Sequence, residues 1–149
     1  MAKENASAFT YVTFIRTTPE KLWNALIDPE FQRQYWFGVH FETEWKQGAS
    51  WKMIYADGRI TDTGEVLEFE PPKKLVLRWR NEFRPELREE GYSRCTIDLE
   101  PVGNAVKLRI VHTMDKPESQ FVHAVSEGWP QIMSNLKSLL ETGEICVKR

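Results

Sequence analysis

The sequence has few cysteines and no long apolar run, and each shortage excludes a class of protein. Only Cys95 and Cys146 occur among the 149 residues, and they form no CxxC pair. A disulfide-stapled scaffold is therefore not expected. No apolar run approaches the roughly 20 residues that cross a bilayer, so we expect no membrane span.

Neither sign of charge is in large excess, because 20 basic residues nearly balance 22 acidic ones. The formal net charge is -2 and the sequence pI is about 6.0, which gives no overall basic field for nucleic acid or an anionic membrane. The first ten residues, MAKENASAFT, lack the apolar core of a signal peptide. Together with the few cysteines, this favours a reducing cytoplasm as the location.

Aromatic residues, in contrast, are plentiful at 12%, beside 41% hydrophobic and 28% charged residues. This is a globular composition, and 149 residues are enough for one core without disulfides or metals. The chain contains no internal repeat or low-complexity tract. We expect one domain over residues 1–149, with 1–8 as a flexible tail.

The first third of the chain predicts a strand followed by two short helices. Residues 9–17, FTYVTFIRT, are rich in β-branched and aromatic residues. Thr18 and Pro19 then give a capping side chain and a proline suited to the first helical position, which predicts a helix over 19–27. Asp28 and Pro29 repeat this signal for a second helix over 29–35.

The middle of the chain changes to a period of two, punctuated by turn dipeptides such as Asp57-Gly58 and Gly103-Asn104. The pattern predicts further strands at 40–45, 49–55, 60–70, 74–81, 92–100 and 105–113, which with the first make an antiparallel sheet of seven. A final helix over 118–141, stopped by Gly143, holds a 3.6-residue apolar period and is expected to cover one face. The fold class is α+β.

The last helix contains an unusual triplet, Gly128-Trp129-Pro130. Pro130 has no amide hydrogen for the preceding turn and disfavours helical geometry at Trp129, so the sequence predicts a kink here. A kinked helix over a curved sheet is expected to leave an internal pocket into which Trp129 hangs.

Three stretches in order resemble one known family: TFIRTTPEKLWNALIDPEFQRQYWFG, TGEVLEFEPPKKLVLRW and EGWPQIMSNLKSLLETG. They are similar to the AHSA-type branch of the START and Bet v 1-like superfamily, named after activators of a heat-shock chaperone ATPase. The resemblance implies a helix-grip fold, in which a curved seven-stranded sheet surrounds a long C-terminal helix. It also implies a hydrophobic cavity between the helix and the sheet. The namesake activators carry a second, N-terminal domain, and we find no stretch that resembles it in this sequence.

The expected function is to bind a small hydrophobic or aromatic ligand, as a carrier or sensor, between the last helix and the sheet. Inward alternation and helical spacing nominate the lining residues, with plain core packing as the alternative for each. They are Trp36, Trp51, Met53, Tyr55, Trp79, Ile97, Ile110, His112, Phe121, Val125, Trp129 and Met133.

Two other functions stay open at this point. His112 could act as a general acid or base in an enzyme like the superfamily's polyketide cyclases and aromatases, or could be a histidine satisfied by Asp115 or the backbone. Alternatively, the chain could be a protein-binding module that activates a chaperone. His40, His112 and His123 lack a metal-ligand spacing and no GxSxG elbow is present. We therefore expect no metal, cofactor or covalent catalysis, and either a monomer or a homodimer.

Overall fold

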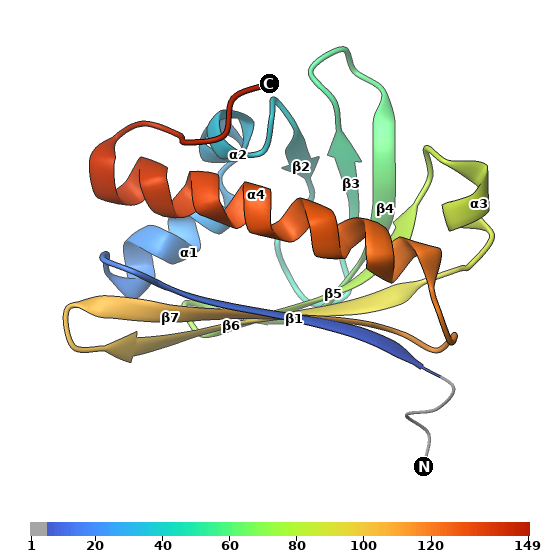
Figure 1. Ribbon diagram of the computed structural model, residues 1–149, viewed down its shortest axis with the longest axis horizontal. Helices are drawn as coiled ribbons and strands as arrows, with labels where there is room; N and C mark the ends of the chain where they lie inside the picture. The colour runs from blue at the N-terminus through green and yellow to red at the C-terminus, as the bar shows by residue number, and fades with distance from the viewer. Residues whose placement is uncertain (1–5) are drawn as a thin grey trace.

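The computed structural model describes residues 6–149 and consists of one curved antiparallel sheet gripping a long helix (Figure 1). The sheet order is β1-β7-β6-β5-β4-β3-β2. Its strands are β1 (Ser7–Ile15), β2 (His40–Glu42), β3 (Ser50–Ile54), β4 (Ile60–Glu70), β5 (Lys74–Asn81), β6 (Ser93–Val102) and β7 (Ala105–Met114). The helices are α1 (Pro19–Ile27), α2 (Pro29–Tyr35), α3 (Pro85–Arg88) and α4 (Gln120–Thr142). This is the predicted α+β helix-grip fold.

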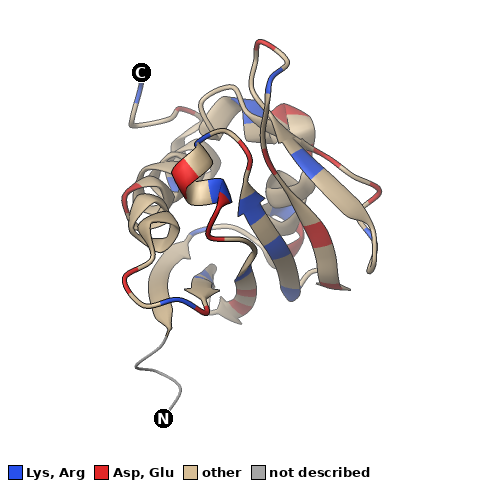
Figure 2. Cartoon of the chain, turned by 90° about the vertical axis from the view of Figure 1, so that its right-hand side faces the viewer, with Lys and Arg blue, Asp and Glu red and all other residues tan. Residues whose placement is uncertain are grey.

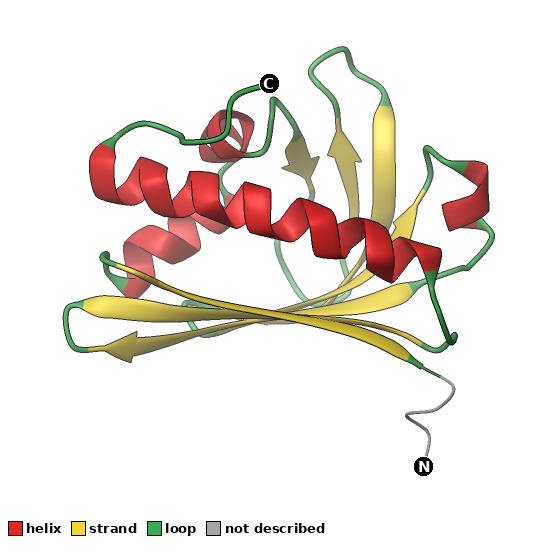
Figure 3. Ribbon diagram, in the orientation of Figure 1, coloured by secondary structure: helices red, strands yellow, loops and turns green. Residues whose placement is uncertain are grey.

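All the helices lie on the same side of the sheet as α4, with α1 and α2 toward one end and α3 toward the other (Figure 3). The bounds of α1 and α2 are those predicted. Thr18 accepts the Lys21 amide hydrogen at 3.2 Å and Asp28 accepts that of Glu30 at 2.9 Å. Each side chain thus satisfies a free donor of a first turn, and the following proline has no amide hydrogen to satisfy.

The first strand begins earlier than predicted. Ser7 and Ala8 belong to β1, so the expectation of a flexible tail is wrong for these two residues, while residues 1–5 lie outside the described part. The Ser7 hydroxyl donates to the Lys116 carbonyl at 2.6 Å and accepts the Ser119 amide hydrogen at 2.9 Å. These bonds tie the start of the strand to the connection before α4.

Some other boundaries also differ from the predictions. β2 covers three residues instead of the predicted 40–45, and Trp45 adopts a left-handed φ of 43° that does not fit a strand. The Trp45 ring packs on Phe41 and Phe69. α3 was not predicted; Pro85 begins this single helical turn between the strands predicted at 74–81 and 92–100.

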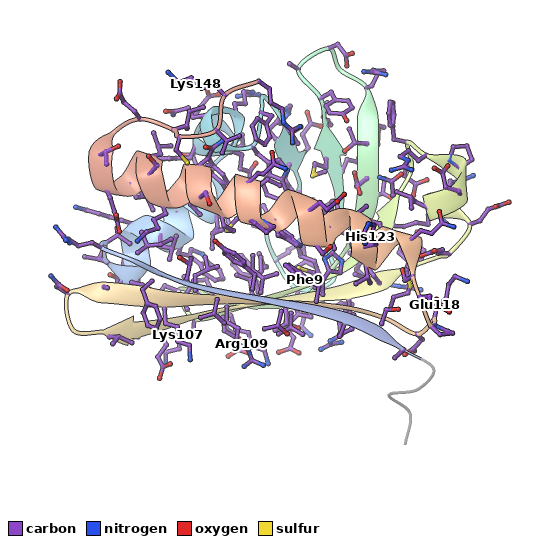
Figure 4. The ribbon with its side chains drawn as sticks, in the orientation of Figure 1. Phe9, Lys107, Arg109, Glu118, His123 and Lys148 are labelled. Atoms are coloured by element: carbon purple, nitrogen blue, oxygen red, sulfur yellow. The ribbon has the colours of Figure 1, made fainter. Side chains whose placement is uncertain are left out.

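Alternation along the strands separates a dry face from a wet one. Inward residues such as Trp51, Leu77 and Ile110 are buried. Phe9 lies on the α4 side of the sheet, whereas Lys107 and Arg109 point away from it (Figure 4). Positions of basic and acidic residues are interspersed along the chain in Figure 2, in keeping with the small net charge of -2.

Gly64 lets two tryptophans meet across three strands. Its register partners are Trp51 on β3 and Trp79 on β5. The Trp51 indole crosses the bare glycine and donates Nε1–H to the Arg78 carbonyl at 3.1 Å. A Cβ at this position would lie 1.7 Å from that carbonyl oxygen, so only glycine fits here.

α4 runs from Gln120 through Gly128, Trp129 and Pro130 to Thr142 as one helix. Ser119 caps its start by accepting the Val122 amide hydrogen at 3.1 Å, and Gly143 ends it with a φ of 87°. The proline therefore does not end the helix, and Trp129 points inward with 2% of its surface exposed. No helix in the described residues is long and apolar enough to cross a membrane.

Glu90 joins the connection after α3 to the start of α4. Its carboxylate accepts the Ser119 hydroxyl hydrogen at 2.6 Å and the amide hydrogens of Gln120 at 2.8 Å and Phe121 at 3.2 Å. A negative charge at a helix N-terminus is favourable, because the first amide hydrogens have no partner inside the helix. Glu90 thus fixes the α3 connection against α4.

Candidate functional site

A hollow of about 160 Å³ opens between the first half of α4, strands β3 to β5, and α3. We call it the inner hollow. Half-buried residues of α4, among them Val125 and Ile132, border it and leave it accessible from solvent. Its lining consists of Trp36, Met53, Asp62, Trp79, Asn81, Leu87, Phe121, Ala124, Val125, Gly128, Trp129 and Ile132.

A second hollow of about 330 Å³ adjoins it, and we call this one the outer hollow. The two share several lining residues, including Met53, Asp62 and Gly128. The outer hollow continues toward Tyr55 and Arg84 and reaches Arg149 at the end of the chain. Together they form one cleft that is apolar inside and polar toward its mouth.

The remaining space beneath α4 is filled. The void among Leu77, Ile97, Met133 and their neighbours measures only about 10 Å³, which is at most the space of a single water molecule. The indole rings occupy the centre: the Trp129 ring centroid lies 5.3 Å from that of Trp36 and 5.8 Å from that of Trp79. The open space is thus at the α3 end and not under the whole helix.

Gly128 helps to create this opening. It lines both hollows, and a Cβ built on it would meet no atom within 4 Å. A glycine inside a helix costs about 1 kcal/mol relative to alanine. The missing side chain widens the cleft, whereas the sequence analysis had linked the Gly128-Trp129-Pro130 triplet only to a kink.

Asp62 places a carboxyl group in the wall of the cleft. It is 4% exposed and lines both hollows. Trp79 Nε1–H donates to Oδ2 at 2.7 Å and Asn81 Nδ2–H donates to the same oxygen at 3.4 Å. Oδ1 can therefore still accept a hydrogen bond from a ligand.

Burial has the largest effect on the pKa of the Asp62 carboxyl group. Removal from water disfavours the carboxylate and raises its pKa, and the negative charge of Glu82 acts in the same direction. Hydrogen bonds from Thr61, Trp79 and Asn81 lower the pKa but only in part. The site thus holds a carboxyl group whose charge is not fully compensated.

His112 lies outside the cleft and is fully buried. Trp129 Nε1–H donates to its Nδ1 at 3.2 Å, and its Nε2 lies 2.8 Å from the Ser93 hydroxyl. An indole N–H can only donate, so Nδ1 accepts and Nε2 carries the proton in the neutral ring. Ser93 in turn donates to the Trp79 carbonyl at 3.1 Å.

The direction of these hydrogen bonds does not suit a histidine that acts as a general base toward Ser93. His112 donates to Ser93 instead of taking its proton, so Ser93 is not an activated nucleophile. Burial lowers the pKa of His112 to about 3, because the imidazolium would lose its water. The expected partner Asp115 makes no bond to His112; Ser93 and Trp129 satisfy both ring nitrogens.

The structure gathers half of the predicted site residues around the inner hollow: Trp36, Met53, Trp79, Phe121, Val125 and Trp129. Tyr55 lines the outer hollow, whereas Ile97 and Met133 border only the small void under α4. Trp51, Ile110 and His112 line none of these three spaces. Their contacts are those of core packing.

The sequence reasoning missed the polar end and the α3 wall, notably Asp62, Asn81 and Leu87. One signal was available for Asp62. It stands two and four residues before Gly64 and Val66 on the same strand, and alternation that turns Val66 inward also turns Asp62 inward. Leu87 gave no comparable signal, because α3 itself was not predicted.

The part of the chain described here holds no group of three or more His, Cys, Asp or Glu side chains placed to bind a metal ion. The inner hollow offers one carboxyl group and one amide among apolar and aromatic side chains. Such a lining suits an organic molecule.

Comparison with known proteins agrees with the fold. The family described as "Activator of Hsp90 ATPase homolog 1-like protein" matches residues 16–141. A crystal structure of a protein from Mesorhizobium loti shares 24% identity over 93% of this chain and 100% of that one, with a TM-score of 0.78. At that identity the likeness shows the fold alone.

Two further similar structures are an Hsp90 activator and an Aha1 dimer. An Hsp90 activator from Plasmodium falciparum is 25% identical over 89% of this chain and 95% of that one, with a TM-score of 0.72. The Aha1 dimer from Colwellia psychrerythraea is 19% identical over 92% and 98%, with a TM-score of 0.74. A comparison with curated protein sequences finds no match.

Proposed function

Because the chain belongs to the Activator of Hsp90 ATPase homolog 1-like family, with the helix-grip fold, we propose that it binds a small hydrophobic or aromatic molecule in the cleft between α4, the sheet and α3. The proposal rests on the inner hollow, which is lined by several aromatic rings and one buried carboxyl group. A pocket of this kind combines apolar surface with a few polar groups that fix orientation.

The size of the cleft limits the ligand. An apolar cavity of roughly 150 Å³ accepts benzene, and the inner hollow measures about 160 Å³. One aromatic ring or a short aliphatic body therefore fits inside, and a longer substituent would extend into the outer hollow of about 330 Å³. Apolar burial at about 25 cal/mol per Å² would supply most of the affinity.

Binding is favoured over catalysis by the position of the titratable groups. The cyclase-like alternative relied on His112 as acid or base. That side chain is buried behind Trp129, and both of its ring nitrogens are occupied. A carrier or sensor requires no such group.

Activation of a chaperone ATPase is the second candidate. It is favoured by the family match and by the likeness to the Hsp90 activator from Plasmodium falciparum over nearly all of that chain. This activity would use an outer surface, so it does not compete with the cleft. An ATPase assay with purified Hsp90 tests it: stimulation supports the activity, and an unchanged rate argues against it.

The ligand-binding proposal is tested by filling the cleft. In Gly128→Leu the new side chain enters space that is open in the structure, so the fold should persist while the cleft is blocked. Titration with phenylethanol, followed by tryptophan fluorescence, should give saturable binding to the wild type and a loss of roughly tenfold or more in the variant.

His123→Leu is the matched control. His123 lies on the same helix with its side chain 77% exposed, so this variant should bind as the wild type does. Equal affinities of Gly128→Leu and the wild type would contradict the proposal.

A further inference from the structure

The inner hollow has a simple electrostatic character. Among the described residues that line it, Asp62 alone has an ionisable side chain. The remaining lining is aromatic or aliphatic except for the Asn81 amide. A ligand in this hollow therefore meets at most one formal charge, and that charge is negative.

The protein does not neutralise this charge. Within residues 6–149, no Lys, Arg or His forms an ion pair with Asp62, and the side chains that donate hydrogen bonds to it, those of Thr61, Trp79 and Asn81, are neutral. The nearby Glu82 is negative and is itself engaged by Arg80 at 2.6 Å and Arg88 at 2.8 Å. A buried carboxylate without a cation is unfavourable, so a positively charged ligand would supply the missing partner.

The aromatic walls point to the same ligand charge. The rings of Trp36, Trp79 and Trp129 pack together, with centroid separations of 5.3 to 6.4 Å, and all three line the hollow with Phe121 and Asp62. Aromatic faces attract ammonium groups within about 6 Å of the ring centroid. Recognition by several aromatic rings and one carboxylate is typical of binding sites for organic cations.

Resting on the proposed function, we propose that the cleft selects a cationic amine with a compact apolar body. The ammonium group would donate to Asp62 Oδ1 and the apolar body would occupy the space between Phe121, Val125 and Leu87. A neutral hydroxyl group could make the same hydrogen bond but would leave the carboxylate charge uncompensated. An anion would be repelled.

The positive groups near the cleft are restricted to its outer part. Arg84 and Arg149 line the outer hollow and not the inner one. Arg84 pairs with Glu86 at 2.7 Å, and Arg149 lies over the Phe37 ring at 3.8 Å and donates to Gln131. Asp62 also lines the outer hollow, but neither guanidinium group forms an ion pair with it.

Three probes of nearly equal shape test this inference: phenylethylamine, phenylethanol and phenylacetate, which are cationic, neutral and anionic at neutral pH. Each is titrated against the wild type, Asp62→Asn and the control Asp98→Asn, which changes a carboxyl group on the outward side of β6. Asparagine preserves an acceptor for the Trp79 N–H, and circular dichroism verifies the fold of each variant.

The wild type and Asp98→Asn should bind the amine roughly tenfold more tightly than the alcohol. In Asp62→Asn this preference should disappear, while the affinity for the alcohol stays within about twofold. Equal binding of the amine and the alcohol by the wild type, preference for the acetate, or an unchanged amine affinity in Asp62→Asn would overturn the inference and leave the proposed function standing. Failure of all three probes to bind the wild type would overturn both.

Discussion

At the scale of single residues, two buried polar side chains have different tasks. His112 supports the core, since its hydrogen bonds hold Trp129 from one side and Ser93 from the other. Asp62 lacks such complete compensation and opens on the cleft. Alternation predicted that His112 points inward, but alternation does not tell whether an inward side chain meets a void or another side chain.

The low pKa of His112, about 3, predicts a pH-dependent stability. The histidine of the unfolded chain takes up a proton near pH 6.5, whereas the folded one stays neutral. The stabilisation is therefore complete above this pH and is lost as the pH falls toward the folded pKa, by up to about 1.4 kcal/mol per pH unit. Urea denaturation between about pH 7 and pH 5 measures the slope.

His112→Gln removes the titrating group and should flatten this part of the pH profile, at a cost of about 1–3 kcal/mol at neutral pH from the imperfect replacement of two hydrogen bonds. His123→Gln, at an exposed position, should leave the slope unchanged. Parallel profiles of the wild type and His112→Gln would rule out this origin of the slope.

At the scale of elements, the sheet depends on one glycine. Gly64 lies between Trp51 and Trp79 in the sheet register, lets their rings pack with centroids 4.9 Å apart, and permits the Trp51 bond to the Arg78 carbonyl. The sequence marked a strand over 60–70 correctly but gave no role to Gly64, because the crossing of the indole is a contact between strands.

Gly64→Ala should destabilise the fold by roughly 3 kcal/mol or more, since its methyl group would overlap the Arg78 carbonyl oxygen and the Trp51 ring. Gly128→Ala serves as the contrast. It adds the same methyl group in open space within a helix, and it should stabilise by up to about 1 kcal/mol. Denaturation midpoints distinguish the two variants, and equal shifts would contradict the close approach of Trp51 and the Arg78 carbonyl to Gly64.

At the scale of the whole molecule, local signals predicted the architecture well. The capping residues before Pro19 and Pro29 predicted α1 and α2 with correct bounds, the β-branched residues of 9–17 predicted the first strand, and the period of two predicted the other six. The cleft could be predicted only in part. Its aromatic wall follows from alternation, but its position depends on α3 and on how tightly the indoles fill the centre, and both are set by tertiary packing.

Glu90 connects two distant parts of the chain, so its removal should loosen one end of the molecule. Glu90→Ala leaves three donors at the start of α4 without their acceptor, and we expect a loss of about 1–2 kcal/mol. Hydrogen exchange at the amides of Gln120 and Phe121 should accelerate. Glu89→Ala, at an exposed neighbouring position, should leave exchange unaltered, and slow exchange in Glu90→Ala would contradict this role.

The two cysteines differ sharply in environment. Cys95 is fully buried in the core, and burial raises the pKa of its thiol. Cys146 is exposed in the segment after α4. Its backbone N–H donates to the Asn135 side-chain oxygen at 3.0 Å. Arg149, three residues later, borders the outer hollow. A maleimide dye would therefore react at one place in the native protein, close to the mouth of the cleft, without any engineered attachment point.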